Sequence, residues 1–507
     1  MLLTTIVVIL SFIIVLYFYL KIKYFTLRGI APGLKPQFLL GNVLQTGVLD
    51  GESLVNVYSK LQKDYGDIFQ FWLGTYHFYV FNKAEHAQQI FSNRQIYDLG
   101  DIVQNSFSLI YEHGFFAIKS AKYKRHARAF MPLLRKNKVT KHLNKIVDSM
   151  DKFISNWKTY NGPHYLNSKI VEETQSLSFD ILMALLLSDK DLHEVYINRQ
   201  QVLSSALQTV SDINYSALSL SIFLPSCLLR MYLRFNRKYQ KAQNIWREFI
   251  NDIINRELDR LRQIEKHERT NLIASVVASL QTDEAKEMKK REEEKQGLSR
   301  EELFQEILSI IEAGTDPPAT AISWWIYYMS KYPVVQEKIK QELMANGITK
   351  ETYLTNELLE KLQYVDCVVK ELLRHAPIFS STMKTLKQND EIDGIKLAKG
   401  DTVLVAYYNM HKDKRYWKLD PIQFIPERFF GLDAKDKDHH RYALNTFGGG
   451  PRQCMGQDLA RLLLKTMITR LMQHFTFVDG GPEKNTGRHF QLGETMKPDM
   501  AVYIYCD

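Results

Sequence analysis

Residues 447–456 read FGGGPRQCMG, and a run with helical periodicity begins directly after them at Leu459. Three adjacent glycines and a proline favour an irregular loop whose backbone can approach a flat ligand closely. Cys454 then lies near a helix N-terminus, where the helix dipole and free N–H groups favour a thiolate. A thiolate there is a suitable single axial ligand for haem iron, and Arg452 is placed to pair with a carboxylate such as a haem propionate.

Other kinds of site fit this loop less well. A phosphate-binding loop requires Gly-Lys-Ser/Thr after its glycines, and a structural zinc site requires further cysteines or histidines nearby. The chain has four scattered cysteines, too few for a disulfide framework: Cys227, Cys367, Cys454 and Cys506. An ordinary buried cysteine would not explain the adjacent glycines and arginine.

The same ten residues match the pattern F-x-x-G-x-R-x-C-x-G at every fixed position: Phe447, Gly450, Arg452, Cys454 and Gly456. The chain thereby resembles the cytochrome P450 superfamily, and it looks most similar to the membrane-anchored eukaryotic type. The resemblance implies a mainly α fold with small β-sheets (α+β), built as a triangular helical prism around haem b. It also implies that these five residues bind the cofactor and that Cys454 is the metal ligand.

Two further motifs agree with the resemblance. Glu371 and Arg374 match E-x-x-R and would lie one turn apart on a helix, where they can pair. Residues 426–429 read PERF, which matches a downstream family motif. The resemblance implies that Arg428 completes a buried cluster with Glu371 and Arg374, which steadies the cysteine loop.

Composition is that of a globular protein: 507 residues, 45% hydrophobic and 24% charged, which excludes disorder and small disulfide scaffolds. A prior of roughly 150 residues per domain suggests three domains. No linker or repeat interrupts residues 50–507, however, so we expect one haem domain there. The net charge of +9 suits an acidic partner or surface; no motif points to nucleic acid, and we expect no nucleic-acid partner.

Periodicity predicts a long helix over residues 303–329, introduced by the capping-box pair Ser299 and Glu302. It also predicts helices over 362–373 and 459–475. Strand-like segments are 69–73, 77–81 and a hairpin-like stretch at 391–405. The mixed-charge run at 283–295 suits a solvated loop or helix end.

Residues 1–20 contain no charge and are densely apolar. Twenty residues at ~1.5 Å rise span a ~30 Å hydrocarbon core, so we expect a single-pass transmembrane anchor. Basic residues in the stem at 21–49 place the catalytic domain on the cytoplasmic side; with the resemblance, this implies the endoplasmic reticulum membrane. The apolar stretch 218–230 is open to two interpretations, a core helix or a surface segment that dips into the bilayer.

The long helix departs from the family pattern A-G-x-D/E-T-T/S. Ala313, Gly314 and Asp316 match, but Pro317 stands where the oxygen-activating threonine is expected. The resemblance implies catalytic roles for the three matching residues. Proline has no hydroxyl or N–H and disrupts a helix interior, so proton delivery is expected to be altered. Thr320, three residues on, is a hydroxyl that could substitute.

A second departure concerns the haem propionates. Where relatives have W-x-x-x-R, residues 123–128 read YKRHAR, and Lys384 stands where an arginine is often found. The resemblance implies propionate contacts from Tyr123 and Lys384. The basic residues of this helix form either a solvated face or a face that docks an acidic reductase. The candidates for the docking face are Lys122, Lys124, Arg125 and Arg128.

The resemblance implies a monooxygenase that inserts one oxygen atom from O2 into a lipophilic substrate. Electrons would come from NADPH through a membrane-bound flavoprotein reductase, and a cytochrome b-type donor is a further partner. Position relative to the motifs suggests pocket residues, although aromatics there are more often core: Phe107, Phe115, Phe116, Ile310, Ile378 and Phe379. Because Pro317 replaces the threonine, two alternatives stay open: an NADPH-independent isomerase or dehydratase of lipid hydroperoxides, and a haem-binding protein with little turnover.

Overall fold

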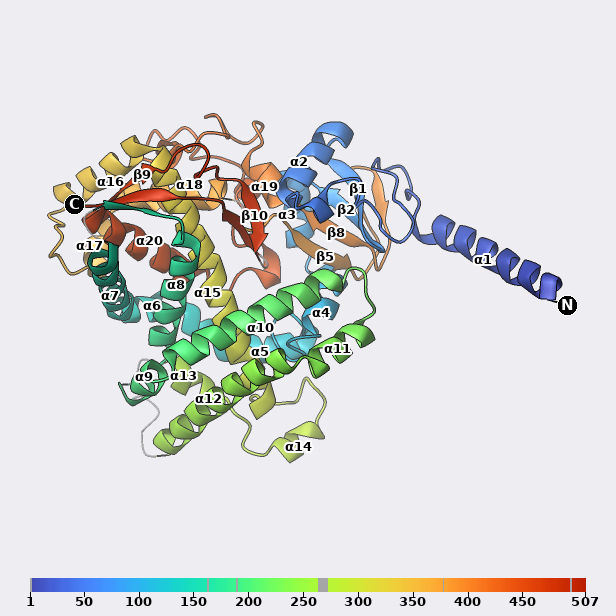
Figure 1. The fold of residues 1–507 in the computed structure, drawn as a ribbon, viewed down its shortest axis with the longest axis horizontal. Coiled ribbons are helices and arrows are strands. Elements are labelled where there is room, and N and C mark those ends of the chain that lie inside the picture. The colour runs from blue at the N-terminus through green and yellow to red at the C-terminus, as the bar shows by residue number, and fades with distance from the viewer. Residues whose placement is uncertain (1, 162–163, 188–189, 263–271, 377, 493–494) are drawn as a thin grey trace.

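The computed structural model describes the chain except Met1 and residues 162–163, 188–189, 263–271, 377 and 493–494. Met1, the first residue of the predicted anchor, therefore lies outside the described part. The fold is mainly helical with small β-sheets, as the sequence predicts (Figure 1).

The first ten helices are α1 (Leu2–Tyr24), α2 (Leu54–Tyr65), α3 (Ala84–Ser92), α4 (Asp101–Phe107), α5 (Ser120–Phe130), α6 (Lys136–Val139), α7 (Leu143–Asn161), α8 (Ile170–Leu186), α9 (Lys190–Ile197) and α10 (Gln200–Leu220). The next ten are α11 (Ser226–Phe235), α12 (Arg237–Leu261), α13 (Leu272–Val277), α14 (Glu284–Met288), α15 (Arg300–Lys331), α16 (Pro333–Ala345), α17 (Asn356–Lys361), α18 (Gln363–His375), α19 (Tyr407–His411) and α20 (Gln457–His474).

The strands are β1 (Ile68–Leu73), β2 (Tyr76–Phe81), β3 (Tyr97–Leu99), β4 (His164–Asn167), β5 (Thr382–Leu386), β6 (Asp390–Ile392), β7 (Ile395–Leu397), β8 (Thr402–Val405), β9 (Phe475–Asp479), β10 (His489–Leu492), β11 (Thr495–Pro498) and β12 (Val502–Cys506). The largest sheet has the order β1-β2-β8-β5-β3, with β2 and β8 parallel. A second sheet has the order β4-β12-β9, and β6–β7 and β10–β11 form two-stranded sheets.

The long helix α15 runs through the helical body (Figure 1). Its start is the predicted capping box: the Ser299 hydroxyl accepts from the Glu302 N–H, and the Glu302 carboxylate accepts from the Ser299 N–H. Trp324 and Trp325 on α15 are almost fully buried in the main hydrophobic cluster, which also contains side chains of α7, α8, α18 and α20. The predicted helices at 303–329, 362–373 and 459–475 are confirmed as α15, α18 and α20.

The strand predictions hold in part. Segments 69–73 and 77–81 form the antiparallel pair β1–β2, with Phe69 opposite Val80. The stretch 391–405 begins as the hairpin β6–β7, but its last strand, β8, leaves to pair with β2 and β5. The buried side chains of β8 favour the centre of the large sheet over the edge of a short hairpin.

Helix α1 stands away from the body as a separate rod (Figure 1). Residues 4–24 are long and apolar enough to cross a membrane and are not buried against the rest of the chain. The predicted stem at 21–49 is not a free linker, because Gly33 and Gly41 form bridges to β1 and Val43 is buried beside the sheet.

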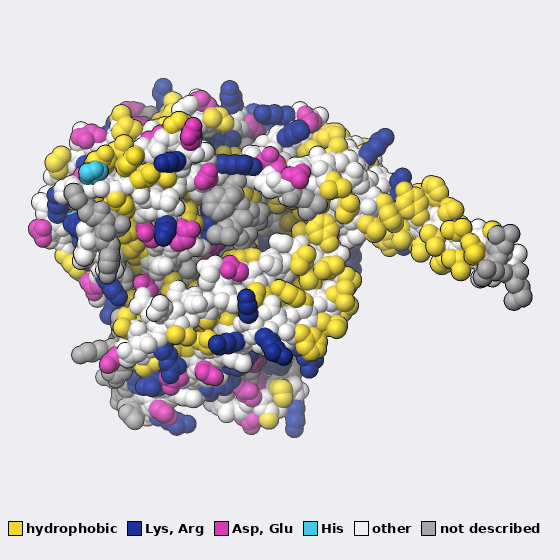
Figure 2. Space-filling model, in the orientation of Figure 1, with side chains coloured by type: hydrophobic (Ala, Val, Ile, Leu, Met, Phe, Trp, Pro, Cys, Tyr) yellow, Lys and Arg dark blue, Asp and Glu magenta, His cyan; other side chains and the backbone are white. Residues whose placement is uncertain are grey.

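The apolar stretch 218–230 covers the end of α10, a turn and the first part of α11. A fully buried core helix is the wrong interpretation, because several apolar side chains here and further along α11 are exposed: Leu220, Phe223, Leu224, Leu228, Met231 and Phe235. Figure 2 shows hydrophobic side chains along α1 and again over the neighbouring surface of the body.

Candidate functional site

The cysteine loop connects a short turn at Arg441–Ala443 to helix α20. The Cys454 N–H donates to the Phe447 carbonyl (2.9 Å), and the Gln453 N–H donates to the Gly450 carbonyl (3.1 Å), which folds the loop on itself. Gly450 has a φ of +71°, and an added Cβ there would lie 2.7 Å from the Phe91 carbonyl. An added Cβ on Gly449 would lie 2.6 Å from the Phe91 ring. These two glycines therefore allow the loop backbone to pack closely against α3. The sequence predicted instead that they allow close approach to a flat ligand.

Cys454 lies three residues before the first residue of α20, and its side chain is exposed. Although the side chain is accessible, neighbouring protein atoms partly desolvate the thiol and raise its pKa, while the Gly456 N–H acts in the opposite direction. The predicted preference for a thiolate at this helix N-terminus stays a prediction. A bound metal ion would reverse this balance, because a coordinating thiol is deprotonated.

Three predicted propionate-binding residues are brought together. The Arg452 guanidinium lies over the Tyr123 ring, 3.5 Å from its centroid, and donates to the carbonyls of Phe115 (3.3 Å) and Ile118 (2.7 Å). Lys384 lies close enough that the charge of Arg452 contributes to lowering its pKa. The site thus gathers two cations and a phenol on one side of the cysteine loop.

Lys384 is buried, with only 6% of its surface exposed. Burial lowers the pKa of Lys384 to about 8, helped by the neighbouring Arg452. Its Nζ lies 6.0 Å from the centroid of the Phe91 ring. No described carboxylate lies within ion-pair distance, and the charge of Asp98 compensates Lys384 only in part. A buried cation of this kind suits an anionic ligand group.

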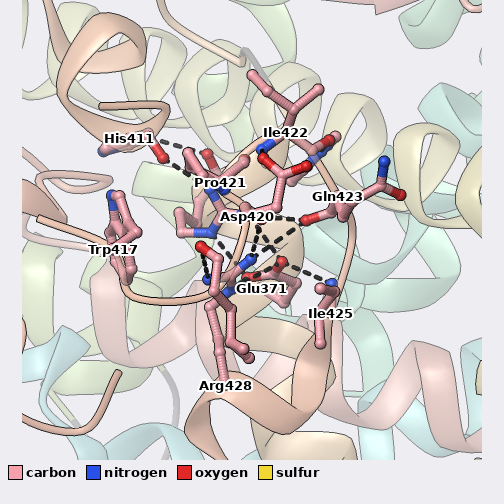
Figure 3. A network of polar contacts seen from close by, with 12 residues as sticks. Glu371, His411, Trp417, Asp420, Pro421, Ile422, Gln423, Ile425 and Arg428 are labelled. Atoms are coloured by element: carbon pink, nitrogen blue, oxygen red, sulfur yellow. Dashed lines mark hydrogen bonds and ion pairs between the residues drawn. The ribbon is translucent and has the colours of Figure 1, made fainter. Parts of the chain in front are cut away.

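Glu371, Arg374 and Arg428 form a fully buried cluster. Figure 3 shows Glu371 and Arg428 within its network of polar contacts. Arg374 makes two hydrogen bonds to the Glu371 carboxylate, at 2.7 and 2.8 Å, and Arg428 Nε lies 3.0 Å from it. Asp436, which no motif predicted, pairs with Arg428 Nη1 at 2.6 Å. The remaining guanidinium N–H groups donate to backbone carbonyls of the segment around Pro421, so every charge in the cluster is partnered.

His411 connects this cluster to the cysteine loop. Arg374 Nη1 donates to the His411 carbonyl (2.6 Å), and the His411 Nδ1 lies 3.1 Å from the Arg374 carbonyl. The Asn445 N–H points at His411 Nε2 (3.1 Å), so the ring donates through Nδ1 and accepts through Nε2. Burial lowers the pKa of His411 to about 3, which keeps this neutral tautomer. The Asn445 carbonyl in turn accepts from the Gly448 N–H, within the cysteine loop.

Helix α15 carries the other predicted site residues and remains helical through Pro317 and Pro318. Ala313 is exposed, and Gly314 packs against α8, where an added Cβ would lie 2.8 Å from Leu182. Asp316 points to β11: its Oδ1 lies 2.6 Å from Lys497 Nζ, and its Oδ2 accepts from the Thr495 hydroxyl at 2.6 Å.

The remaining hydroxyls of this turn are already engaged. Thr320 is fully buried, and its Oγ1 lies 2.8 Å from Thr495 Oγ1. Thr315 donates to the Ile311 carbonyl, one turn earlier on its own helix (2.7 Å). The prediction that Thr320 substitutes for the missing hydroxyl at 317 is therefore not favoured by this geometry.

Comparison with known proteins identifies the family. Residues 31–501 match the family model described as Cytochrome P450, which covers most of the chain. This chain is a cytochrome P450.

The matched relatives are distant. Cytochrome P450 4V2 of Mus musculus is 33% identical over 213 residues, which cover 42% of this chain and 40% of the relative. Cytochrome P450 709B1 of Arabidopsis thaliana is 24% identical over 431 residues, which cover 83% of this chain and 78% of the relative. The alignment to the mouse relative thus spans less than half of that protein.

A solved structure shares the fold. The chain described as "Retinoic acid bound cyanobacterial CYP120A1" superposes with a TM-score of 0.75 at 22% identity, covering 94% of this chain and 99% of that chain. The predicted P450 architecture is thereby confirmed.

The residues present fit the haem that this P450 family implies. Cys454 offers an accessible sulfur, and Lys384 offers a buried positive charge without a described carboxylate partner. Among the described residues, no group of three or more His, Cys, Asp or Glu side chains could hold a metal ion.

The predicted pocket residues separate into two groups. Phe115 is a core residue, because its ring contacts those of Tyr123 and Phe130 inside a buried cluster. The other five are only partly buried or exposed, and their role in the pocket remains a prediction: Phe107, Phe116, Ile310, Ile378 and Phe379.

The prediction that Arg125 belongs to a basic docking face is wrong. It is buried and forms a bidentate pair with Glu302, at 2.7 and 2.8 Å, and a further hydrogen bond to Glu292 at 2.8 Å. The helical phase of α5 turns it inward towards the start of α15, where the cost of burying it is offset by two carboxylates. Lys124 and Arg128 are the exposed members of the group.

Proposed function

We propose that this P450 is a haem-thiolate monooxygenase acting on a lipophilic substrate. Each turnover would combine substrate, O2, NADPH and one proton to give hydroxylated product, water and NADP⁺. The observation that carries the proposal is the Cys454 loop joined through His411 to the buried cluster around Glu371. When bound, haem supplies the oxygen chemistry, and thiolate ligation favours O–O cleavage.

The chain's own residues account for retention of the cofactor. We propose that Cys454 binds the iron and that Arg452 and Lys384 hold the propionates by charge. The Tyr123 hydroxyl, which donates to the Pro451 carbonyl in this structure, would donate to a propionate instead when haem is bound. Phe447, Gly450 and Gly456 shape the loop. Of the three propionate-binding residues, Lys384 has the greatest need of a counter-charge, because it is buried without a described carboxylate partner.

Pro317 favours a second candidate from another reaction class. An isomerase or dehydratase of lipid hydroperoxides needs no proton delivery to O2, so the absent hydroxyl would cost it nothing. The occupied hydroxyls of Thr315 and Thr320 strengthen this candidate. A haem-binding protein with little turnover is the third candidate, since the Cys454 side of the site is compatible with all three.

The proposed location is the endoplasmic reticulum membrane, with α1 spanning the bilayer and the haem domain on the cytoplasmic side. Support comes from the unburied apolar α1 and from the exposed apolar side chains at the α10–α11 turn (Figure 2). Gly74 at the β1–β2 turn packs against Ile222 and Phe223, which holds this turn beside the sheet that follows the anchor. A lipophilic substrate would enter from the bilayer.

The proposed electron donor is a membrane-bound NADPH-dependent flavoprotein reductase, with a cytochrome b-type protein as a second donor. Lys124 and Arg128 are exposed on α5, next to the helix residue Tyr123 whose hydroxyl donates to the Pro451 carbonyl in the cysteine loop. These two cations would complement an acidic partner near the haem edge.

A single series of assays separates the candidates. The reduced carbon-monoxide difference spectrum of the full chain is expected to show a thiolate-ligated haem, and its absence would overturn the haem-thiolate assignment. Product that requires NADPH and reductase supports the monooxygenase. Consumption of a lipid hydroperoxide without either supports the isomerase, and neither activity with an intact spectrum supports the binding protein. Cys454→Ser is the control that should lose the spectrum.

A further inference from the structure

Two acidic residues of α15 lie one turn apart beside the proline turn, and their surroundings differ. Glu312 and Asp316 are four residues apart on the same side of the helix. Pro317, the residue directly after Asp316, has no side-chain hydroxyl. Their partners therefore indicate which acid can exchange a proton.

Asp316 is held by a buried cation. Lys497 of β11, only 1% exposed, lies 2.6 Å from Asp316 Oδ1, and Gln175 of α8 donates to the same oxygen at 3.0 Å. Moving the carboxylate would leave a buried ammonium unpaired, which is costly. Asp316 is thus fixed in place by groups on two other elements.

The hydroxyls around Asp316 are committed to this arrangement. Thr495 has one hydroxyl proton and donates it to the Asp316 carboxylate, so in the 2.8 Å contact between Thr320 and Thr495 the donor is Thr320. Trp324, two turns after Asp316, donates its indole N–H to the Met496 carbonyl (2.7 Å). Asp316, Thr320 and Trp324 together attach β11 along one face of α15.

Glu312 has only uncharged partners. Its Oε1 accepts from Ser211 (3.1 Å) and Asn214 (3.2 Å) of α10, and Tyr111 is a further hydrogen-bonding neighbour. The other titratable groups that face it are Tyr239 of α12 and Asp316 on its own helix. None of these is a cation, so only hydrogen bonds from uncharged groups favour the charged form of the carboxylate, and burial outweighs them.

Glu312 is also linked to the segment that carries three of the predicted pocket residues. Its neighbour Tyr111 belongs to the segment between Phe107 and Phe116, and the residue after it, Ala313, is exposed. Burial raises the pKa of Glu312 to about 7. A carboxyl with this pKa can hold or release a proton near neutral pH.

We propose that Glu312 is the acid that exchanges a proton beside the proline turn, and that Asp316 is a positioning residue that anchors β11 to α15. The inference rests on the proposed monooxygenase, in which two protons, two electrons and O2 are consumed as product and water form. Glu312 gives one of these protons, becomes a carboxylate that accepts from Ser211 and Asn214, and regains its proton from solvent.

The test compares Glu312→Gln with Asp316→Asn in the full-length, haem-loaded protein. The parent's rate of NADPH-dependent product formation per haem should change with an inflection near pH 7. Glu312→Gln should lose the inflection and fall on the order of tenfold or more, as for a removed general acid. Asp316→Asn should keep the inflection but unfold at a lower denaturant concentration.

Unfolding gives a readout that does not depend on turnover. A glutamate with a raised pKa in the folded state makes the parent less stable as pH rises from ~4.3 towards 7, and Glu312→Gln should remove that part of the decrease. Asp316→Asn and Lys497→Met should each destabilise the protein, and the double variant should be less destabilised than their sum.

The outcomes are distinguishable. If the parent turns over, two results would overturn this inference alone. One is an inflection that persists in Glu312→Gln, and the other is an inflection that disappears in Asp316→Asn. Additive effects of Asp316→Asn and Lys497→Met overturn the anchoring role. A parent without NADPH-dependent turnover overturns the proposed function, and the inference with it.

Discussion

The cysteine side and the long-helix side of the site differ in where their partners come from. On the cysteine side, Glu371 and its two arginines are partnered mainly within recognisable motifs. On the long-helix side, Asp316 is partnered by Lys497, which lies 181 residues further along the chain. The motif residues Glu371, Arg374 and Arg428 therefore form a buried cluster largely among themselves, whereas Asp316, beside the departure at Pro317, is bound by residues of a C-terminal strand.

The largest expected effect is on the cysteine side. Glu371→Gln would leave Arg374 and Arg428 buried with one compensating carboxylate, Asp436, instead of two. We expect a loss of about 3–5 kcal/mol in the free energy of unfolding, typical of a broken buried ion cluster. Urea denaturation of the full chain measures this loss.

The matched control is Glu427→Gln on the neighbouring turn. Glu427 pairs with Lys338 at 2.5 Å, but both side chains are more than a third exposed. Its loss should cost about 1 kcal/mol or less. Equal effects of the two variants would contradict the view that burial gives the Glu371 cluster its importance.

Replacing Lys384 should raise the free energy of unfolding, whereas Glu371→Gln should lower it. Its pKa, lowered to about 8 by burial, means that charged Lys384 destabilises the haem-free protein at neutral pH. Lys384→Met should therefore stabilise the haem-free protein at pH 7 by about 3 kcal/mol, while weakening haem retention.

The lowered pKa of Lys384 also predicts the pH range over which stability changes. Between pH ~8 and ~10 the unfolded chain binds more protons at this lysine than the folded chain, so the stability of the haem-free parent should rise with pH there. Lys384→Met should lack that rise. Lys387→Met, which removes an exposed lysine paired with Asp98 at 2.7 Å, serves as the control and should keep it.

A smaller effect is expected at His411, which joins the cluster to the cysteine loop. His411→Phe would leave the Asn445 N–H and the Arg374 carbonyl without this partner. We expect a loss of about 2 kcal/mol and faster haem release, measured by transfer to a haem-accepting globin. His440→Phe, at a less buried position before the same loop, loses only the hydrogen bond from the Tyr442 N–H and should not speed haem release. If it releases haem as fast as His411→Phe, the His411 link is not what steadies the loop.

The motifs predicted the cysteine side well because its key residues are close in sequence or fixed by helix geometry. Glu371 and Arg374 are one turn apart on α18, and that spacing alone brings them together. Asp436 and His411 could not be predicted, because each is a single residue on a short turn or helix and its role depends on how distant segments pack.

The long-helix side could be predicted only as a departure from the family pattern. Pro317 was visible in the sequence, but the partners of Asp316 were not, since Thr495 and Lys497 belong to a C-terminal hairpin with no motif of its own. Arg125 was placed on the wrong surface for a related reason. A run of basic residues does not reveal which of them helical phase turns towards a carboxylate.

Pro317→Thr tests whether the long-helix side can be returned to the family pattern. Threonine restores an N–H that can donate to the Ala313 carbonyl, so we expect a gain of about 1 kcal/mol in stability, that of one net hydrogen bond. The new hydroxyl should also raise product formed per NADPH and lower peroxide release, both measured in the same assay. Thr315→Val is the control, because its hydroxyl already bonds to Ile311 and its removal should not change this ratio. If Pro317→Thr leaves peroxide release and product yield unchanged, position 317 does not limit the reaction, and the network built around Asp316 and Glu312 already supplies what the family obtains from a threonine.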